Sequence, residues 1–188
     1  MKIAVFVGSI REGRTGITIG QWAIEQLEAR NDGHEYLLID ILEQDLNPNT
    51  AVPPRMVANG EYADPKTLAW AELIGGVDAF IFVTPEYNAS VPGPMKDAYD
   101  LLYAEWTGKP IGFIGYGSDA ARTAVSHWND IVGRVGMTIV PAQAEFTFEE
   151  HFPEFVFTPG KQGTTWINAI ADELIDAAVT TQTPSLTS

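Results

Sequence analysis

The sequence predicts a single α/β domain, built on a five-stranded, doubly wound parallel sheet with helices on both faces. Short apolar runs recur along the chain at wide intervals, and each precedes a turn signal and then a stretch with helical spacing. The runs lack the alternation of a strand with one face in water, so they suit strands that are buried on both faces. The 188 residues are enough for one such domain and few for two.

Each apolar run marks one strand. In chain order, the predicted strands are Ile3–Val7, Tyr36–Ile39, Ala79–Val83, Ile111–Ile114 and Thr138–Val140. We expect the domain to occupy residues 1–179, because residues 180–188 are polar with one proline and are predicted to form a flexible tail.

The helices are predicted from apolar residues that recur on one stripe. The first helix would turn Ile17, Ile24 and Leu27 inward, and Pro65 and Pro94 stand where the second and third helices could begin. The residues expected to point inward are Leu68, Leu73 and Ile74 in the second helix, and Ala98, Leu101 and Leu102 in the third. In the fourth helix they are Val125, Trp128, Ile131, Val132 and Val135, and in the fifth, which starts at about Thr165, they are Ile167, Ile170, Leu174 and Ile175.

Two predicted connections, residues 43–64 and 146–163, are longer than about 12 to 15 residues, a length that usually marks a binding loop, a lid or disorder. The second is rich in aromatic residues, which indicates that it packs against a subunit partner or a flat ligand. We therefore expect a homodimer or a tetramer. The aromatic residues behind this expectation are Phe148, Phe152, Phe155 and Phe157, with Tyr99, Tyr103 and Trp106 at the end of the third helix.

Composition excludes several classes of function. Eleven Lys and Arg against 25 Asp and Glu give a net charge of −14, which would repel nucleic acid and anionic membrane surfaces. The absence of cysteine excludes disulfides, thiolate metal sites and a catalytic thiol, so redox chemistry would need a bound organic cofactor. His34, His127 and His151 are too dispersed for a metal motif, and we expect no metal site. With no secretory signal and no spanning segment, a cytoplasmic location is expected.

The loop Gly8–Gly16 lies between the first strand and the first helix. A helix N-terminus offers free N–H groups and a partial positive charge, so an anion belongs there. Ser9 and Thr15 add hydroxyl groups, and Arg11 and Arg14 add charge. The alternative is an ordinary glycine-rich turn with solvated arginines.

Two other motifs are nearly matched. Gly8 and Gly13 have P-loop spacing, with Arg14 at the lysine position and Asp40 available for magnesium, but a planar guanidinium cannot curl into the phosphate cradle as an ammonium does. The turn Gly115–Ala120 has the G-x-G-x-x-A form of a dinucleotide fingerprint. The next strand runs into Pro141 and lacks the acidic residue that this fingerprint needs, so the match is interpreted as incidental.

The loop Thr84–Gly93 follows the third strand, near the switch point where doubly wound sheets bind ligands. It combines two prolines, Pro85 and Pro92, with an aromatic ring and several amide or hydroxyl groups. Such a stiff, polar rim suits the edge of a flat heterocycle. A rigid connection without a ligand is the alternative.

Four stretches together resemble the NADPH-dependent FMN reductase family, over about residues 3 to 178. They are Gly8–Gly16, Gly60-x-Tyr62 with Trp70, Thr84–Ala98 and the turn Gly115-Tyr116-Gly117-Ser118. The resemblance implies a flavodoxin-like fold and a bound FMN, with NADPH or NADH as cosubstrate. It also implies subunit pairing and a small-molecule electron acceptor, such as a quinone, free flavin, an azo compound or a metal oxyanion.

The resemblance further implies which residues hold FMN. Those around the phosphate would be Ser9, Arg11, Arg14, Thr15, Gly16 and Ile17. Those at the isoalloxazine would be Pro85, Glu86, Tyr87, Asn88 and Ser90, with Gly117 and Ser118 on its pyrimidine side. No catalytic side chain is expected, because the flavin carries the chemistry, although backbone N–H groups near Asn88 and Gly117 could stabilise the reduced ring.

The chain departs from the family pattern at two places. Ala120-Ala121 stands where many relatives carry Gly-Gly, and Asp97 stands where Asn is usual. The alternative function is that of a flavodoxin-type electron carrier without small-molecule reductase activity. Arg11 and Arg14 disfavour it, because such carriers usually have a Thr-x-Thr-Gly-x-Thr phosphate loop.

Overall fold

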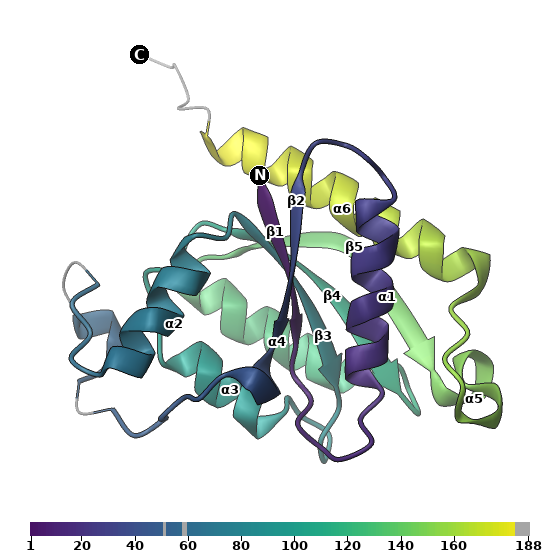
Figure 1. Cartoon of the computed structure of the whole chain (residues 1–188), viewed down its shortest axis with the longest axis horizontal. Coiled ribbons are helices and arrows are strands. Elements are labelled where there is room, and N and C mark those ends of the chain that lie inside the picture. Colours follow the sequence, from purple (N-terminus) through teal and green to yellow (C-terminus); the bar gives the residue numbers. More distant parts are fainter. Residues whose placement is uncertain (51, 58–59, 183–188) are drawn as a thin grey trace.

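A computed structural model describes residues 1–50, 52–57 and 60–182. It confirms the predicted sheet: five parallel strands in the order β2-β1-β3-β4-β5 (Figure 1). This order is that of the flavodoxin-like sheet. The strands are β1 (Lys2–Val7), β2 (Glu35–Asp40), β3 (Ala79–Pro85), β4 (Pro110–Gly117) and β5 (Thr138–Thr147).

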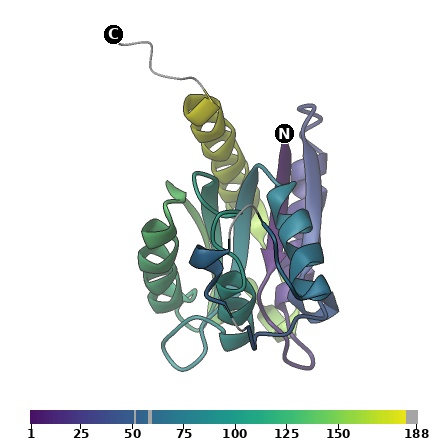
Figure 2. The ribbon, with the colours of Figure 1, turned by 90° about the vertical axis from the view of Figure 1, so that its left-hand side faces the viewer.

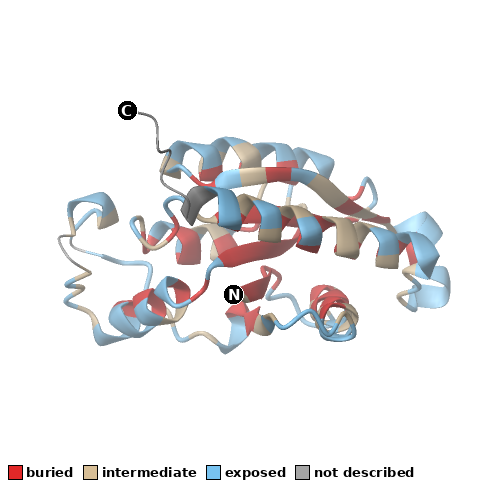
Figure 3. Ribbon diagram, turned by 90° about the horizontal axis from the view of Figure 1, so that it is seen from above, coloured by how far each residue is buried: buried red, intermediate tan, exposed pale blue. Residues whose placement is uncertain are grey.

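Helices cover both faces of the sheet. One face packs against α1 (Gly16–Glu28) and α6 (Gly160–Gln182), the longest helix, whose carboxyl-terminal part projects beyond the sheet (Figure 2). The other face packs against α2 (Pro65–Gly75), α3 (Gly93–Asp100) and α4 (Arg122–Val135). Buried residues concentrate on the strands between these layers (Figure 3). None of the described helices is long and apolar enough to cross a membrane.

Most inward positions were predicted correctly, but Ile17 is only half-buried and Leu68 was wrong. Leu68 is exposed, because α2 buries Thr67, Trp70, Ala71 and Ile74 instead. Trp70 donates a hydrogen bond of 2.9 Å from its indole to the carbonyl of Ala98, which fixes the side of α2 that faces α3.

The predicted connection 146–163 is partly regular structure. β5 continues past Pro141 to Thr147, and proline is tolerated there because β5 is an edge strand whose pairing with β4 is irregular. The chain then forms α5 (Phe148–His151) and the 3-10 turn η3 (Pro153–Phe155), and α6 starts at Gly160 rather than near Thr165. The predicted tail was wrong at residues 180–182, which belong to α6, and residues 183–188 lie outside the described residues.

The aromatic residues that suggested subunit contacts are mostly core. Tyr99 and Trp106 are buried and stack at 4.9 Å between ring centroids, within a cluster that joins α2, α3 and α4. Phe146 and Phe152 are also buried, beside Trp166 of α6. Phe148 and Phe155 are the exposed ones in this segment.

Candidate functional site

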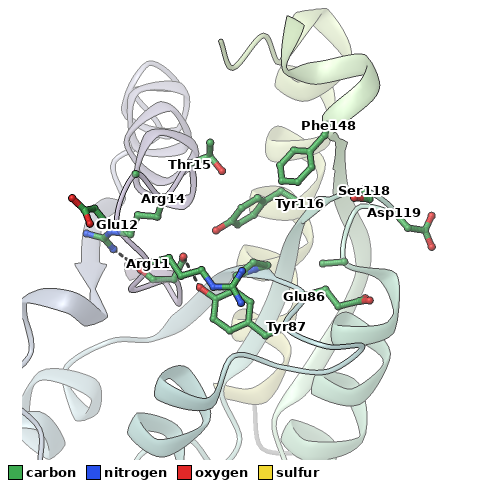
Figure 4. A pocket seen from close by; sticks show the side chains of 15 residues that line it. Arg11, Glu12, Arg14, Thr15, Glu86, Tyr87, Tyr116, Ser118, Asp119 and Phe148 are labelled. Atoms are coloured by element: carbon green, nitrogen blue, oxygen red, sulfur yellow. Dashed lines mark hydrogen bonds between the residues drawn. The ribbon is translucent and has the colours of Figure 1, made fainter. Parts of the chain in front are cut away.

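A cavity of about 410 Å³ opens at the carboxyl ends of β1, β3 and β4 (Figure 4). It lies between the N-terminus of α1, the loops after β3 and β4, and α5, in the size range of small-molecule sites. Its lining residues are Ser9, Arg11, Glu12, Gly13, Arg14, Thr15, Pro85, Glu86, Tyr87, Tyr116, Gly117, Ser118, Asp119, Ala121 and Phe148.

The N-terminus of α1 faces this cavity without a cap. Thr15 is the N-cap residue but makes no side-chain capping hydrogen bond, and the first turn contains no acidic residue. The first N–H groups of a helix have no partner within it, so those of α1 are available to an anion. Gly16 packs under Tyr116, whose hydroxyl would lie 2.5 Å from a Cβ at residue 16.

The Arg14 side chain is held by hydrogen bonds to other groups of the protein. Its Nη1 donates to Asp40 Oδ1 at 2.5 Å and to the carbonyl of Ser9 at 2.6 Å, and its Nη2 donates to Asp40 Oδ2. The hydrogen bond from the Arg14 side chain to Asp40 raises the pKa of Arg14. The two groups that a P-loop would direct at phosphate and magnesium thus bind each other.

Arg11 is placed differently. Its guanidinium lies 3.8 Å from the centre of the Tyr87 ring, and Tyr87 in turn shares a hydrogen bond of 2.9 Å with Ser9 (Figure 4). Within residues 1–50, 52–57 and 60–182, no carboxylate forms an ion pair with Arg11. An exposed cation at the cavity therefore remains available to an anionic ligand.

The loop after β3 is held by its own turn. Tyr87 and Ser90 exchange backbone hydrogen bonds, and Asn88 and Ala89 between them have φ of 50° and 58°, the pattern of a type I′ turn. Ser90 Oγ lies 3.0 Å from His127 Nδ1, on α4. Asn88 and Ser90 therefore lie outside the cavity lining, whereas Pro85, Glu86 and Tyr87 line it.

Glu86 caps a helix. Its carboxylate accepts hydrogen bonds from the N–H groups of Thr123 and Ala124, at 3.1 and 3.3 Å, in the first turn of α4. This contact ties the loop after β3 to the loop after β4, so the two walls of the cavity hold each other.

The loop after β4 has unusual backbone angles. Gly117 has a φ of 149°, and Ala120 and Ala121 have φ of 49° and 55° although both are buried. Gly115 is required by packing rather than by a ligand, since a Cβ there would lie 2.1 Å from the carbonyl oxygen of Ala120. Packing therefore accounts for the first glycine of the turn that resembles a dinucleotide fingerprint.

Sequence reasoning missed several lining residues: Glu12, Gly13, Tyr116, Asp119, Ala121 and Phe148. Tyr116 could have been found, because it follows the buried run of β4 inside the quoted Gly-Tyr-Gly-Ser turn. It is 3% exposed, and burial raises its pKa to about 12, so it is a neutral hydroxyl at the cavity. Phe148 belongs to the aromatic segment that was expected to pack against a subunit partner or a flat ligand, but its place at this cavity was not predicted, because it depends on the length of β5. No metal-binding group of three His, Asp or Glu side chains occurs in the described part of the chain.

Comparisons with known proteins point to one family. The sequence model of a family described as NADPH-dependent FMN reductase matches residues 1–151. An NAD(P)H-dependent FMN reductase of Schizosaccharomyces pombe is 32% identical over 146 residues, which cover 78% of this chain and 72% of the relative. An NAD(P)H:quinone oxidoreductase of Solanum tuberosum is 31% identical over 110 residues, 58% of this chain and 51% of that protein.

The fold is also found among solved structures. FerB of Paracoccus denitrificans, described as a flavoenzyme NAD(P)H:(acceptor) oxidoreductase, superposes with a TM-score of 0.73 at 24% identity, covering 94% of this chain and 98% of FerB. At this identity the likeness concerns the fold alone.

Proposed function

We propose that the cavity at the carboxyl ends of β1, β3 and β4 is the active site of this chain, which belongs to the NADPH-dependent FMN reductase family. The chain is therefore an FMN-dependent NAD(P)H oxidoreductase. Bound FMN would accept a hydride from the nicotinamide and pass electrons to a second substrate, while the protein supplies binding, orientation and electrostatics.

The observation that carries this placement is the uncapped N-terminus of α1 beside Arg11, a cavity cation that forms no ion pair with a carboxylate of the described residues. A phosphate there would meet the hydroxyls of Ser9 and Thr15 and the N–H groups of Gly16 and Ile17. We assign Arg14 to the positioning of this loop, because its guanidinium holds Asp40 and the Ser9 carbonyl.

The flat ring would lie between the two remaining loops. Pro85, Glu86 and Tyr87 offer one wall, and Gly117 and Ser118 offer the other. A side-chain role for Asn88 and Ser90 at the ring stays a prediction, and their contacts support the task of keeping the turn after Tyr87 in place.

Reconstitution tests the proposal. Purified protein loaded with FMN should bleach the flavin absorbance on addition of NADPH or NADH without air, and should then turn over a quinone, as the names of several relatives suggest. An electron carrier would neither be reduced directly by the nicotinamide nor turn over a small acceptor. Failure of FMN to bind, by fluorescence titration, would contradict the placement of the site.

We also propose a homodimer or a tetramer, now on the basis of other residues. Tyr99 and Trp106 cannot support it, because the chain buries them itself. The residues that support it are the exposed apolar ones between β2 and α2, Leu42, Val52 and Met56, and Phe155, which is 96% exposed. Sedimentation should give a species heavier than one chain of 20.5 kDa. The cytoplasmic location stays a prediction, which cell fractionation would test.

A further inference from the structure

The turn after β5 brings an aromatic side chain to the mouth of the cavity. β5 pairs with β4 as far as Gly117 and Thr147, so Phe148 follows directly beside the loop after β4. Its ring lies near Tyr116 and faces the cavity from the side away from Tyr87 (Figure 4). Phe148 is nevertheless 46% exposed, so part of its apolar surface is available to a ligand.

Contacts within and next to α5 (Phe148–His151) hold Phe148 in this position. Thr147 caps α5 by accepting a hydrogen bond of 3.3 Å from the N–H of Glu150, and its own N–H donates to Nδ1 of the buried His151 at 3.1 Å. The Phe148 ring packs edge-on against Phe152, at 5.3 Å between centroids. The hydrogen bonds hold the backbone around Phe148, and Phe152 supports the Phe148 ring from one side as a wall of the cavity.

The charges around this wall are mostly negative. Glu12, Glu86 and Asp119 line the cavity, and Glu149 and Glu150 follow Phe148 on α5. The nearby cations are already engaged, since Arg14 pairs with Asp40, and Arg122 pairs with Asp119 and Glu145. If Arg11 meets the FMN phosphate, no unpaired cation among these cavity residues is left for an anionic second substrate.

We propose that Phe148 determines acceptor specificity by packing against a planar, uncharged electron acceptor, and that the carboxylates around it disfavour anionic acceptors. The proposal rests on the function proposed above for the cavity. An aromatic ring offers a flat acceptor a large contact area at little cost in conformational entropy, and like charges lower affinity and the rate of encounter.

Equilibrium binding tests the proposal without any turnover. Coumarin and coumarin-3-carboxylate are flat ligands that differ by one negative charge, and their binding to the oxidised, FMN-loaded protein can be followed by flavin absorbance. We expect coumarin to bind at least fivefold more tightly, and Phe148→Ala to weaken it about tenfold. Phe148→Tyr is the matched control and should bind as the wild type does. Equal affinity of Phe148→Ala and wild type for coumarin would overturn the role of Phe148.

The charge component has its own test. The carboxylate ligand should gain affinity as ionic strength rises, because salt screens the repulsion, whereas coumarin should not. Glu149→Gln with Glu150→Gln should reduce that salt dependence. A carboxylate ligand that binds as well as coumarin at low salt contradicts this part of the proposal.

Failure of the proposal can be told apart from failure of the site. The FMN dissociation constant and the rate of flavin bleaching by NADPH are measured first, for wild type and Phe148→Ala. If Phe148 serves the acceptor, Phe148→Ala should lose several-fold more affinity for coumarin than for FMN, and the rate of bleaching by NADPH should fall by less than the affinity for coumarin. A loss of FMN affinity as large as the loss of coumarin affinity would place Phe148 at the flavin and overturn the proposal. If wild type binds no FMN, the proposed function itself is wrong.

Discussion

Arg14 and Asp40 join the loop after β1 to the end of β2 through a two-point ion pair, with Nη1 donating to Oδ1 at 2.5 Å and Nη2 to Oδ2. The side chains are 11% and 5% exposed, so neither charge is well solvated. Asp40 also accepts a hydrogen bond of 3.1 Å from the N–H of Leu42. The pair therefore sets the position of the loop that would receive the phosphate.

Removing one partner of this pair should destabilise the protein. Asp40→Ala would leave the Arg14 guanidinium buried without its counter-ion, and loss of one partner of a buried pair costs about 3 kcal/mol or more. Urea unfolding of the apoprotein measures the change. The double variant Arg14→Met with Asp40→Leu should lose clearly less stability than the single variants Arg14→Met and Asp40→Leu lose together. Additive losses would argue against coupling between the two side chains.

Arg11 should matter for FMN and little for stability. Arg11→Ala should weaken FMN binding by about 1.5 to 3 kcal/mol, because a charge-assisted hydrogen bond to the phosphate is lost. Flavin fluorescence titration gives the dissociation constant. Arg122→Ala is the matched control, since Arg122 is exposed and already bound to Asp119 and Glu145. An equal loss in both variants would mean that general charge, and not a local contact, holds the phosphate.

The sequence placed Arg11 and Arg14 in the same loop but did not predict that they have different partners. The strands and the cavity loops followed from local signals, because buried runs and glycine-rich turns are written in consecutive residues. The partner of Arg14 lies on a neighbouring strand, 26 positions along the chain, and only the parallel pairing of β1 with β2 brings Asp40 to it.

The positions of Phe148 and Leu68 could not be predicted for a similar reason. The position of Phe148 depends on how far β5 continues past Pro141, which the pairing with β4 decides. Leu68 fits the apolar stripe of α2, but the contact of Trp70 with Ala98 decides which side of the helix faces inward. Local pattern gives the element, and tertiary packing sets its end or its rotation.

Gly16 should be intolerant of a side chain for a reason that can be removed. A Cβ at residue 16 would lie 2.5 Å from Tyr116 Oη, so Gly16→Ala forces a shift in the cavity wall and should cost about 1 to 3 kcal/mol of stability. In the Tyr116→Phe background the clashing hydroxyl is absent, and the same change should cost less. Unfolding of the four proteins checks this. The same penalty in both backgrounds would show that the contact with Tyr116 is not the cause.

Ala121 should tolerate replacement by glycine unusually well. Its φ of 55° lies in the left-handed region, where a non-glycine residue is strained by about 1 to 2 kcal/mol. Glycine would relieve this strain, while the flexibility that it adds to the unfolded chain costs about 0.5 to 1 kcal/mol and the lost methyl about 0.8 kcal/mol. These contributions nearly cancel, so Ala121→Gly should unfold within about 0.5 kcal/mol of the wild type. Ala124→Gly, at a buried position in the first turn of α4, has no strain to relieve and should lose about 1 kcal/mol or more. Equal losses in the two variants would mean that the backbone at Ala121 is not strained.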